Sequence, residues 1–375
     1  MASMVLAHAP IRAALDAHVV GRRKTGNETY IVNLAEALAR RDDVEPTVYM
    51  DAGTAWPSQA VLRRRDLHWR APYLRVPLEL PYRARRDGAQ LLHVQYVAPP
   101  VARLPIVTAI HDVSFEDVGG LFSRRTEMRL KLTVRFSARR AASVITISEF
   151  TRSRIVHHYG IDPDRVVVTP LGVDGHWRPL DRDAALAGLA ELALPDRFVL
   201  AVGNLHPRKN ISRLVRAIAR ARQSGAGDLH LVLAGQAGWQ AGQVHETVRE
   251  VGGESWVHTL GYVDDDRLLA LYCAADVVAY VSLYEGFGLP VIEALACGAV
   301  VVASSTTAVP EVAGDAALLV DPASDEAVAD GIARAATDPE LRAALRIAGP
   351  ARAAAFTWER CAERTLDAYR LALRR

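Results

Sequence analysis

The chain has 375 residues, of which 50% are hydrophobic and 23% charged, a composition typical of a folded globular protein rather than a disordered one. This length exceeds one ordinary domain core, so we expect two domains. No apolar run approaches the roughly 18 residues of a membrane-spanning helix, and the start of the chain shows no signal-peptide pattern. Three widely spaced cysteines exclude a disulfide scaffold, and the expected compartment is the cytoplasm.

The net charge of +2 hides an uneven distribution along the chain. Residues 1–180 hold 26 Lys and Arg against 18 Asp and Glu, a net of +8, whereas the remaining residues have a net of −6. The basic groups are Arg63–Arg65, Arg83–Arg86 and seven residues between Arg124 and Arg140. Such groups are usually solvated surface, and they also suit an anionic lipid or acceptor. Aromatic residues make up only 6%, which argues against nucleic acid as a partner.

In the first half of the chain, short apolar runs typical of strands alternate with helical patterns. The six predicted strands are Arg12–Asp16, Val44–Met50, Gln90–Gln95, Ile106–His111, Val144–Ser148 and Val166–Thr169. The predicted helices are Thr29–Arg40, Arg124–Ala142 and Glu149–Tyr159. Met128, Leu132 and Phe136 follow one another at four-residue spacing on the second helix. This spacing favours an apolar side packed against a sheet, with a membrane surface as the alternative.

The second half repeats the alternation after a turn-rich, polar segment between Leu171 and Arg197. Its six predicted strands are Phe198–Val202, His230–Ala234, Trp256–Leu260, Val277–Val281, Val300–Ala303 and Ala317–Val320. The predicted helices are Ile211–Gln223, Val244–Val251, Asp265–Cys273, Leu289–Cys297, Asp325–Thr337 and a last one over Trp358–Arg375. Six strands on each side of a divide predict two doubly wound parallel sheets in an α/β fold.

Signatures of several other enzyme classes are absent. The sequence has no GxxxxGK[ST], no GxGxxG after the first predicted strand, no HExxH and no GxSxG. This argues against a P-loop ATPase, a simple dinucleotide dehydrogenase, a zincin and an α/β-hydrolase.

The strongest motif runs from Glu285 to Glu293, EGFGLPVIE, between a predicted strand and a predicted helix. Gly286 and Gly288 let the backbone approach a ligand closely, and the helix N-terminus offers free N–H groups and a positive dipole. The arrangement predicts a phosphate site. Glu285 at the strand end could reach a sugar, and Glu293 could accept from ribose hydroxyls. The alternative is an ordinary strand–loop–helix turn.

A second motif, GNLHPRKN from Gly203 to Asn210, also closes a strand and precedes a helix. Arg208 and Lys209 would be presented at the carboxyl edge of the sheet, where α/β folds bind ligands. A forked guanidinium beside a compact ammonium suits a diphosphate, although charges at a helix start also serve solubility alone.

Two further features have competing interpretations. His111, at the end of a predicted strand and followed by Asp112, is either a structural residue or a functional one. Asp264–Asp266 could be taken for a metal-binding run, but these residues precede a helical pattern and are predicted to cap it. Asp162 and Asp164 flank a proline and predict a turn. Neither acidic run is therefore interpreted as a metal site.

Together, these motifs resemble those of the retaining GT-B glycosyltransferases of family GT4, and the similarity covers roughly residues 11 to 372. The resemblance implies two Rossmann-like domains that face each other across a cleft. Residues 1–177 would form the N-terminal acceptor domain and residues 178–355 the nucleotide-sugar donor domain. Residues 356–375 would form a helix that crosses back to the N-terminal domain.

The resemblance also implies roles for individual residues. Glu285 would contact the donor sugar, Glu293 the donor ribose, and Arg208 and Lys209 the diphosphate, with His111 facing the sugar as a further catalytic residue. Other implied donor-site residues are Gly26, Gly203, Val263, Gly286, Phe287, Gly288 and Leu289. Many relatives carry a second glycine two residues after the equivalent of Gly26, where this chain has Asn27 and Glu28. The phosphate contact of that loop is therefore left open.

The implied reaction is transfer of a hexose, with retention, from a nucleotide diphosphate sugar to a hydroxyl of a glycan or lipid-linked acceptor. No metal or other cofactor is implied. GDP-mannose is the first expected donor, because the segments look most like those of enzymes that build surface polysaccharides. A UDP-hexose with a small soluble acceptor is the alternative, as are an epimerase or phosphorylase of the same fold and an inactive binding subunit. An anionic membrane is a further expected partner, through peripheral contact at its inner face.

Overall fold

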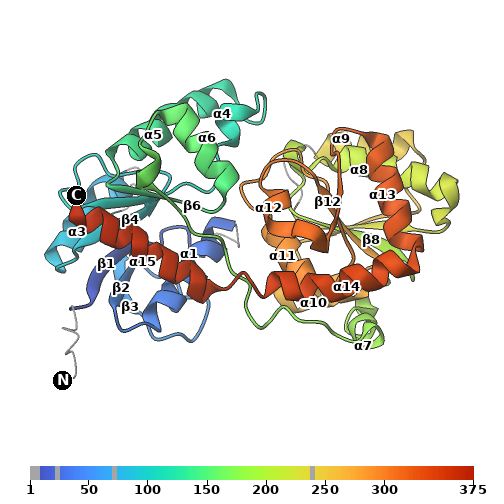
Figure 1. Ribbon diagram of the computed structural model, residues 1–375, viewed down its shortest axis with the longest axis horizontal. Helices are drawn as coiled ribbons and strands as arrows, with labels where there is room; N and C mark the ends of the chain where they lie inside the picture. Colours follow the sequence, from blue (N-terminus) through green and yellow to red (C-terminus); the bar gives the residue numbers. More distant parts are fainter. Residues whose placement is uncertain (1–8, 22–25, 70–73, 237–240) are drawn as a thin grey trace, which may run out of the picture. The chain divides into compact units, whose positions relative to one another are not determined.

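The computed structural model describes residues 9–21, 26–69, 74–236 and 241–375 (Figure 1). The chain divides into two compact units. Unit 1 comprises Met1–Gly172 and Trp358–Arg375, and unit 2 comprises Val173–Thr357. Unit 2 is thus inserted, in sequence, before the last helix of unit 1.

Unit 1 is built on a seven-stranded sheet with the order β3-β2-β1-β4-β5-β6-β7, in which every neighbouring pair is parallel. The strands are β1 (Ile11–Asp16), β2 (Val44–Asp51), β3 (Arg63–Leu67), β4 (Leu91–Gln95), β5 (Ile106–Ala109), β6 (Ser143–Thr146) and β7 (Val166–Val168). The chain runs outward from β1 to β3, then returns to place β4 on the other side of β1. In such sheets, ligands bind at the carboxyl ends of the strands where the order reverses, here between β1 and β4.

The prediction of six strands in this half was wrong by one, because it omitted β3. Four of the five residues of β3 are exposed, and Arg63–Arg65 fill its first three positions. It is one of the two edge strands of the sheet, and charged side chains on an edge strand disfavour pairing with another chain. A strand of this kind lacks the apolar pattern by which the other strands were predicted.

The helices of unit 1 cover its sheet. They are α1 (Gly26–Ala39), η1 (Arg75–Glu79), α3 (Leu80–Arg86), α4 (Ser114–Asp117), α5 (Arg124–Arg140), α6 (Glu149–Tyr159), η2 (Pro163–Arg165) and α15 (Trp358–Arg374). The last helix, α15, packs against α1 and against β4 to β7. Its Tyr369 is fully buried, as is Leu366. The C-terminal helix therefore completes the core of unit 1.

Unit 2 has a six-stranded parallel sheet with the order β10-β9-β8-β11-β12-β13. The strands are β8 (Phe198–Val202), β9 (His230–Ala234), β10 (Val257–Gly261), β11 (Val277–Tyr280), β12 (Val301–Ser304) and β13 (Leu318–Val320). All six predicted strands of this half are confirmed, with ends that differ by one residue or so. The order reverses between β8 and β11, so ligand binding is expected at the carboxyl ends of these two strands.

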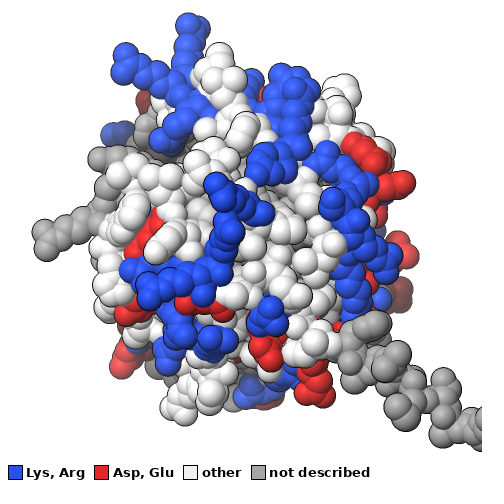
Figure 2. All heavy atoms as spheres, turned by 90° about the vertical axis from the view of Figure 1, so that its left-hand side faces the viewer, with Lys and Arg blue, Asp and Glu red and all other residues white. Residues whose placement is uncertain are grey.

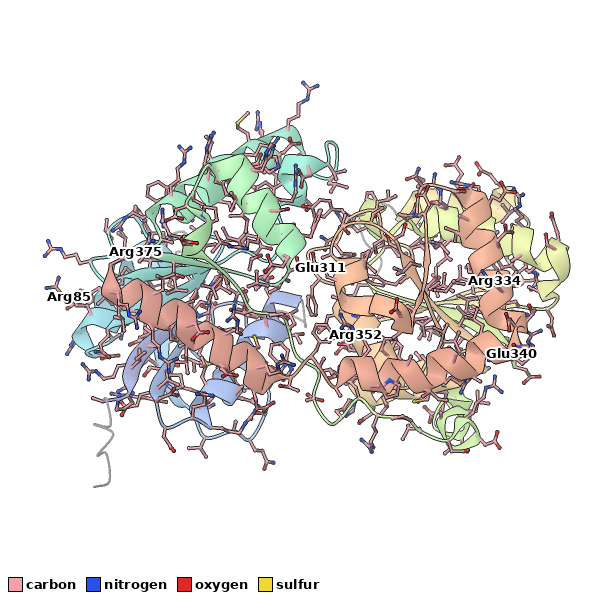
Figure 3. All side chains as sticks on the ribbon, viewed as in Figure 1. Arg85, Glu311, Arg334, Glu340, Arg352 and Arg375 are labelled. Carbon is pink, nitrogen blue, oxygen red and sulfur yellow. The ribbon has the colours of Figure 1, made fainter. Side chains whose placement is uncertain are left out.

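The helices of unit 2 enclose both faces of that sheet, and a long α14 follows the last strand and helix pair. They are α7 (Arg182–Ala187), η3 (Ala190–Leu192), η4 (Pro207–Lys209), α8 (Ile211–Ala221), η5 (Arg222–Ala226), α9 (Ala241–Glu250), α10 (Asp265–Ala274), α11 (Leu289–Ala296), α12 (Val309–Ala313), η6 (Gly314–Ala316), α13 (Asp325–Thr337) and α14 (Pro339–Ala353). Arg352, near the end of α14, donates a hydrogen bond of 2.9 Å from its Nε to the carbonyl of Val312 in α12 and so links the two helices (Figure 3).

Candidate active site

In unit 2, the two predicted motifs meet at the carboxyl ends of the adjacent strands β8 and β11. Lys209 Nζ donates to Glu285 Oε1 at 2.7 Å and to the hydroxyl of Tyr280, also at 2.7 Å. The ammonium also lies 4.5 Å from the centre of the Tyr280 ring. The side chains of Lys209 and Glu285 are only 13% and 8% exposed. The structure thus joins two residues that are 76 positions apart in the sequence into one buried ion pair.

The loops that carry this pair are tied together through backbone groups. The N–H of Leu283 donates to the carbonyl of Arg208 at 2.7 Å. Asn210 has a left-handed backbone with φ of 61°, and its buried amide donates to the carbonyls of Val281 and Pro322. A left-handed residue is needed here to turn the chain from η4 into α8, and asparagine adopts that conformation more readily than most. The amide thereby fixes the position of Lys209 relative to Glu285.

Electrostatics favour the charged form of Glu285. Burial alone would raise the pKa of this carboxyl group, but the charges of Lys209 and Arg208 outweigh burial and hold the pKa below its ordinary value. Burial and the nearby Glu285 raise the pKa of the Tyr280 phenol well above its usual range, so the phenol remains protonated. The site therefore holds an anion, two cations and a neutral hydroxyl at the end of the sheet.

The helix α11 (Leu289–Ala296) begins within the motif that runs from Glu285 to Glu293. Gly288 is its N-terminal cap with φ of 106°, and Pro290 lies in the first turn, where a missing N–H costs little. One turn further on, Glu293 is 9% exposed and accepts a hydrogen bond of 3.0 Å from the hydroxyl of Tyr272. The free N–H groups and dipole at the N-terminus of α11 point toward the loop between Glu285 and Gly288.

The other donor-site residues predicted in unit 2 lie in the same region. Gly203 follows β8 with φ of 136°, and a Cβ there would meet Lys209 Cε at 3.1 Å. Gly286, Phe287 and Leu289 belong to the loop and first turn of α11, and Val263 lies in the loop after β10, half-buried. A side chain at position 203 would therefore crowd Lys209 and would need a backbone conformation that residues other than glycine rarely adopt.

In unit 1, His111 lies two residues beyond the end of β5 and is buried at 7% exposure. Its Nε2 is 3.2 Å from Oε1 of Gln95, the last residue of β4. The ring of Tyr30, from α1, meets the imidazole edge-on with centroids 4.5 Å apart. Burial lowers the pKa of His111 to about 4, against a smaller opposing effect of Asp112, so the imidazole is neutral at physiological pH.

Behind His111 lies a second buried histidine, His93, which the sequence analysis did not single out. Its Nδ1 is 2.8 Å from the hydroxyl of Tyr369, and its Nε2 is 3.2 Å from the hydroxyl of Tyr30. Burial, with a contribution from His111, lowers the pKa of His93 to about 3. His93 therefore links α1 and α15 to the middle of the sheet.

The two other residues considered in unit 1 are Gly26 and Asp112. Gly26 is the first residue of α1, and a Cβ there would meet nothing within 4 Å. No packing within the described structure thus requires glycine at this position. The loop residues 22–25 that precede it lie outside the described residues. Asp112 accepts hydrogen bonds from the backbone N–H and hydroxyl of Ser114, at 3.0 and 2.8 Å.

The acidic runs are helix and turn caps, as predicted. Asp264 accepts from the backbone N–H of Arg267 at 2.9 Å and begins α10. Asp162 accepts from the N–H of Asp164, also at 2.9 Å.

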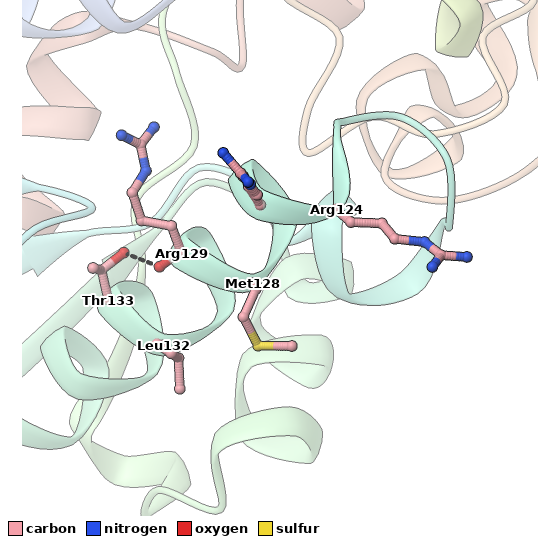
Figure 4. Close-up of a pocket in the computed structure, with 6 residues that line it drawn as sticks. Arg124, Met128, Arg129, Leu132 and Thr133 are labelled. Atoms are coloured by element: carbon pink, nitrogen blue, oxygen red, sulfur yellow. Dashed lines mark hydrogen bonds between the residues drawn. The ribbon is translucent and has the colours of Figure 1, made fainter.

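The apolar stripe on α5 is exposed, so the prediction that it packs against the sheet was wrong. Met128, Leu132 and Phe136 are 59%, 63% and 47% exposed. The buried side of α5 instead uses small or short side chains, Val134, Ser137 and Ala138. A shallow hollow of about 550 Å³ lies over this helix (Figure 4), lined by Arg124, Arg125, Met128, Arg129, Leu132 and Thr133.

Comparison with known proteins identifies the family. Residues 190–352 match glycosyl transferases group 1, and residues 25–176 match glycosyltransferase family 4. O-antigen chain mannosyltransferase B of Escherichia coli is 32% identical over 313 residues, which cover 83% of this chain and 82% of that protein. The chain belongs to the family 4 glycosyltransferases. The MMP α-(1→4)-mannosyltransferase of Mycolicibacterium hassiacum is also 32% identical, over 64% of this chain and 56% of that protein.

Solved structures agree with the GT-B fold of this glycosyltransferase. Sucrose-phosphate synthase of Thermosynechococcus elongatus aligns with a TM-score of 0.77 and 24% identity, covering 96% of this chain and 98% of that one. WaaG, a glycosyltransferase of lipopolysaccharide biosynthesis, aligns with a TM-score of 0.74 and 18% identity, covering 95% and 99%. Among the described residues of the glycosyltransferase, no helix has the length and apolar character needed to cross a membrane.

Sequence reasoning missed Tyr280, Gln95 and His93 as members of the two sites. Each is a polar side chain at or near the carboxyl end of a buried strand, in positions where the neighbouring residues are apolar. Such a residue is a usable signal, because burying a polar group without purpose costs free energy.

Proposed function

We propose that this glycosyltransferase transfers mannose from GDP-mannose to a hydroxyl of a glycan or lipid-linked acceptor, with retention of configuration. The Lys209–Glu285 pair beside the N-terminus of α11 supports a site for a sugar diphosphate in unit 2. The names of the relatives support mannose as the sugar, since an O-antigen chain mannosyltransferase is similar over most of both chains.

In this proposal, unit 2 stabilises the leaving group electrostatically. Arg208, Lys209 and the free N–H groups of α11 face the diphosphate, while Glu285 accepts from hydroxyls of the sugar and Glu293 from the ribose. The bond between the anomeric carbon and the phosphate oxygen breaks, and the acceptor oxygen forms the new bond on the same face. The proton of the acceptor hydroxyl passes to the leaving phosphate oxygen. Because cations of the chain supply the charge, no metal ion is needed.

Donor binding tests the proposal. GDP-mannose, UDP-glucose, GDP and UDP are added separately to the protein, and thermal unfolding is followed, since a ligand that binds only the folded state raises the Tm. We expect the largest shift with GDP-mannose and release of GDP when an acceptor glycan is present. Glu293→Gln should reduce the shifts caused by both GDP and UDP, because the ribose is common to them. A larger shift and turnover with UDP-glucose would establish the UDP-hexose alternative, and no shift with any of the four would contradict a donor site.

We further propose that α5 brings the enzyme to an anionic membrane, where a lipid-linked acceptor would be found. The helix has seven basic residues and one acidic residue, Glu127. Lys131 pairs with Glu127 at 2.7 Å, and Arg139 and Arg140 donate to backbone carbonyls. Among the described residues, no ion-pair partner is found for the remaining four arginines, which are Arg124, Arg125, Arg129 and Arg135.

Charge and exposure support this partner over a further protein. Three large apolar side chains lie exposed on the same helix as the four arginines, which is the composition of a helix that lies in a membrane interface. Each basic residue near an anionic surface contributes roughly 1 kcal/mol. The basic excess is not confined to α5: on the face shown in Figure 2, Lys and Arg side chains cover more surface than Asp and Glu.

Vesicle sedimentation tests the membrane proposal. We expect reversible binding to vesicles with anionic lipid, little binding to neutral vesicles, and loss of binding as salt rises to physiological strength. Replacing Met128, Leu132 and Phe136 with serine, or the four arginines with glutamine, should each weaken binding. Ile347→Ser is the matched control, because Ile347 is 77% exposed on α14 of unit 2. Equal binding to neutral and anionic vesicles, or none to either, would contradict this partner.

A further inference from the structure

Gln95 occupies the position where the strand order of the first sheet reverses. It is the last residue of β4, which lies between β1 and β5, and it is 6% exposed. Its Oε1 is 3.2 Å from His111 Nε2. Its Nε2 is buried and has no hydrogen-bond partner among the described residues. A buried amide that uses only one of its two ends is costly unless something else occupies the other end.

The contact with Gln95 determines which form of His111 is present. An amide oxygen only accepts, so Nε2 of the neutral imidazole must carry the hydrogen, and Nδ1 retains its lone pair. The ring is held in place by Tyr30 and by Tyr96, whose ring centre is 5.7 Å away. Gln95 therefore sets the orientation and the proton position of His111 and leaves one nitrogen able to accept a hydrogen bond.

Two more buried polar atoms at this edge lack partners. Asp16 ends β1, next to β4, and uses Oδ1 to bind His18 at 2.7 Å, while its Oδ2 is unpartnered. Glu28, in the first turn of α1, uses Oε1 to accept from the N–H of Gly21 at 2.8 Å, while its Oε2 is unpartnered. Both are at least nine-tenths buried. Two vacant acceptors and one vacant donor suit a ligand with several hydroxyl groups, and two acidic groups disfavour an anionic one.

We propose that Gln95 binds a substrate hydroxyl through Nε2 while Oε1 positions His111, and that this edge of unit 1 binds an uncharged, hydroxyl-bearing sugar. This inference rests on the proposed glycosyl transfer and assigns part of its substrate site. A sugar hydroxyl can accept from Gln95 Nε2 and donate its own hydrogen to Asp16 or Glu28. Recognition of the sugar therefore depends on both ends of the Gln95 amide, because Oε1 binds His111 and Nε2 binds the substrate hydroxyl.

Gln95→Leu removes both ends of the amide with little change in volume. We expect kcat/KM to fall about 10- to 100-fold, since one substrate hydrogen bond and the orientation of His111 are lost together. Binding of GDP or UDP, measured by thermal shift, should be unchanged, because unit 2 holds the nucleotide. Thr146→Val is the matched control: its hydroxyl is also buried and unpartnered, on β6 of the same sheet, and its removal should leave kcat/KM unchanged.

Gln95→Glu separates positioning from packing. The new carboxylate still accepts from His111 Nε2, but its charge should raise the pKa of the histidine above the wild-type value of about 4. The groups that face His111 are Tyr30 from α1, His93 from β4, and Tyr96 and Asp112 from the adjoining loops. The acid limb of the kcat profile should therefore move to higher pH, which a purely structural residue would not cause.

The outcomes distinguish this inference from the function on which it rests. If the wild-type protein turns over no nucleotide sugar, the proposed function fails. If the wild type is active and Gln95→Leu matches it in kcat/KM, or Gln95→Glu leaves the acid limb in place, the role of Gln95 is wrong while the function stands. If Gln95→Leu loses activity only in proportion to a lower Tm, a structural role is established instead.

Discussion

The buried polar groups of unit 2 are bonded to one another, whereas those at the corresponding edge of unit 1 are partly unpaired. In unit 2, Lys209 is bonded to Glu285 and Tyr280, and Glu293 to Tyr272. In unit 1, Asp16, Glu28 and Gln95 each keep one buried atom without a partner, and no such atom is found in the described part of unit 2. Each unpaired group costs on the order of 1–3 kcal/mol. The polar groups of unit 2 are thus already paired with one another, whereas those of unit 1 leave donor and acceptor atoms that the proposed substrate would use.

The largest effect should come from breaking the internal pair of unit 2. Lys209→Ala should lower turnover roughly 10²- to 10³-fold, because an electrostatic stabiliser would be lost from the proposed diphosphate site. Lys209→Arg should recover only part of the rate, since a planar fork does not replace a compact ammonium between Glu285 and Tyr280. Steady-state kinetics with a saturating acceptor would measure both. Near wild-type turnover in Lys209→Ala would show that Lys209 does not stabilise the leaving diphosphate.

The second effect concerns acid stability and should appear in unit 1. The pKa values of His111 and His93 are lowered to about 4 and about 3, below the ordinary value near 6.5, because both are buried as neutral rings. Their stabilising contribution is complete above pH 6.5 and is lost as the pH falls toward those values. At pH 5 the loss is about 2 kcal/mol for each histidine.

Hydrogen exchange between pH 7 and pH 5 would locate this loss. We expect unit 1 to lose protection first, and His93→Gln to reduce the pH dependence by about half. Acid unfolding that begins in unit 2, or the same slope in His93→Gln, would show that these histidines do not control it.

A smaller difference is expected between matched removals of one hydroxyl. Tyr272→Phe in unit 2 leaves Glu293 with one partner fewer and should lower the free energy of unfolding by roughly 1–3 kcal/mol. Thr108→Val in unit 1 removes a buried hydroxyl that has no partner and should change it by less than about 0.5 kcal/mol or stabilise the protein. Urea unfolding measures both values. Equal losses in the two variants would erase the contrast between the units.

The smallest effect should be that of a chelator. Because Arg208 and Lys209 supply the positive charge at the proposed diphosphate site, we expect EDTA to leave the initial rate of transfer unchanged. Loss of turnover that is restored by Mg²⁺ or Mn²⁺ would show that the cations of the chain are insufficient.

Much of the fold could be predicted because most strands are short apolar runs that can be recognised from the local sequence alone. Most strands of unit 2 are four- or five-residue apolar runs, and two of them, Phe198–Val202 and Val277–Tyr280, are buried along almost their whole length in the parallel sheet. Arg63–Leu67 is a strand only because it pairs with β2, and its own residues favour solvent. On α5 the stripe of Met128, Leu132 and Phe136 is an amphipathic pattern, which is compatible both with packing against the sheet and with exposure at the surface. The sequence does not reveal that smaller residues fill the buried side.

The candidate site could be predicted in its residues but not in its pairing. The two motifs of unit 2 are recognisable from glycines and charges that each follow a strand. Lys209 follows β8 and Glu285 follows β11, and the two residues meet because β8 lies between β9 and β11 in the sheet. This strand order is a property of the whole sheet, and neither motif indicates it. Gln95 belongs to no motif, and its contact with His111 is visible only in the structure.

The position of α15 has a consequence for the order in which the protein can fold during synthesis. Tyr369 supplies the hydroxyl that meets His93 in the middle of the first sheet, and Trp358–Arg374 covers β4 to β7. The ribosome makes these residues only after all of unit 2. During synthesis, the sheet of unit 1 therefore lacks α15 on one face until unit 2 has been translated, although unit 1 is made first. A stop codon that removes α15 would leave the first unit permanently in that state, exposed to chaperones and proteases, beside an intact second unit.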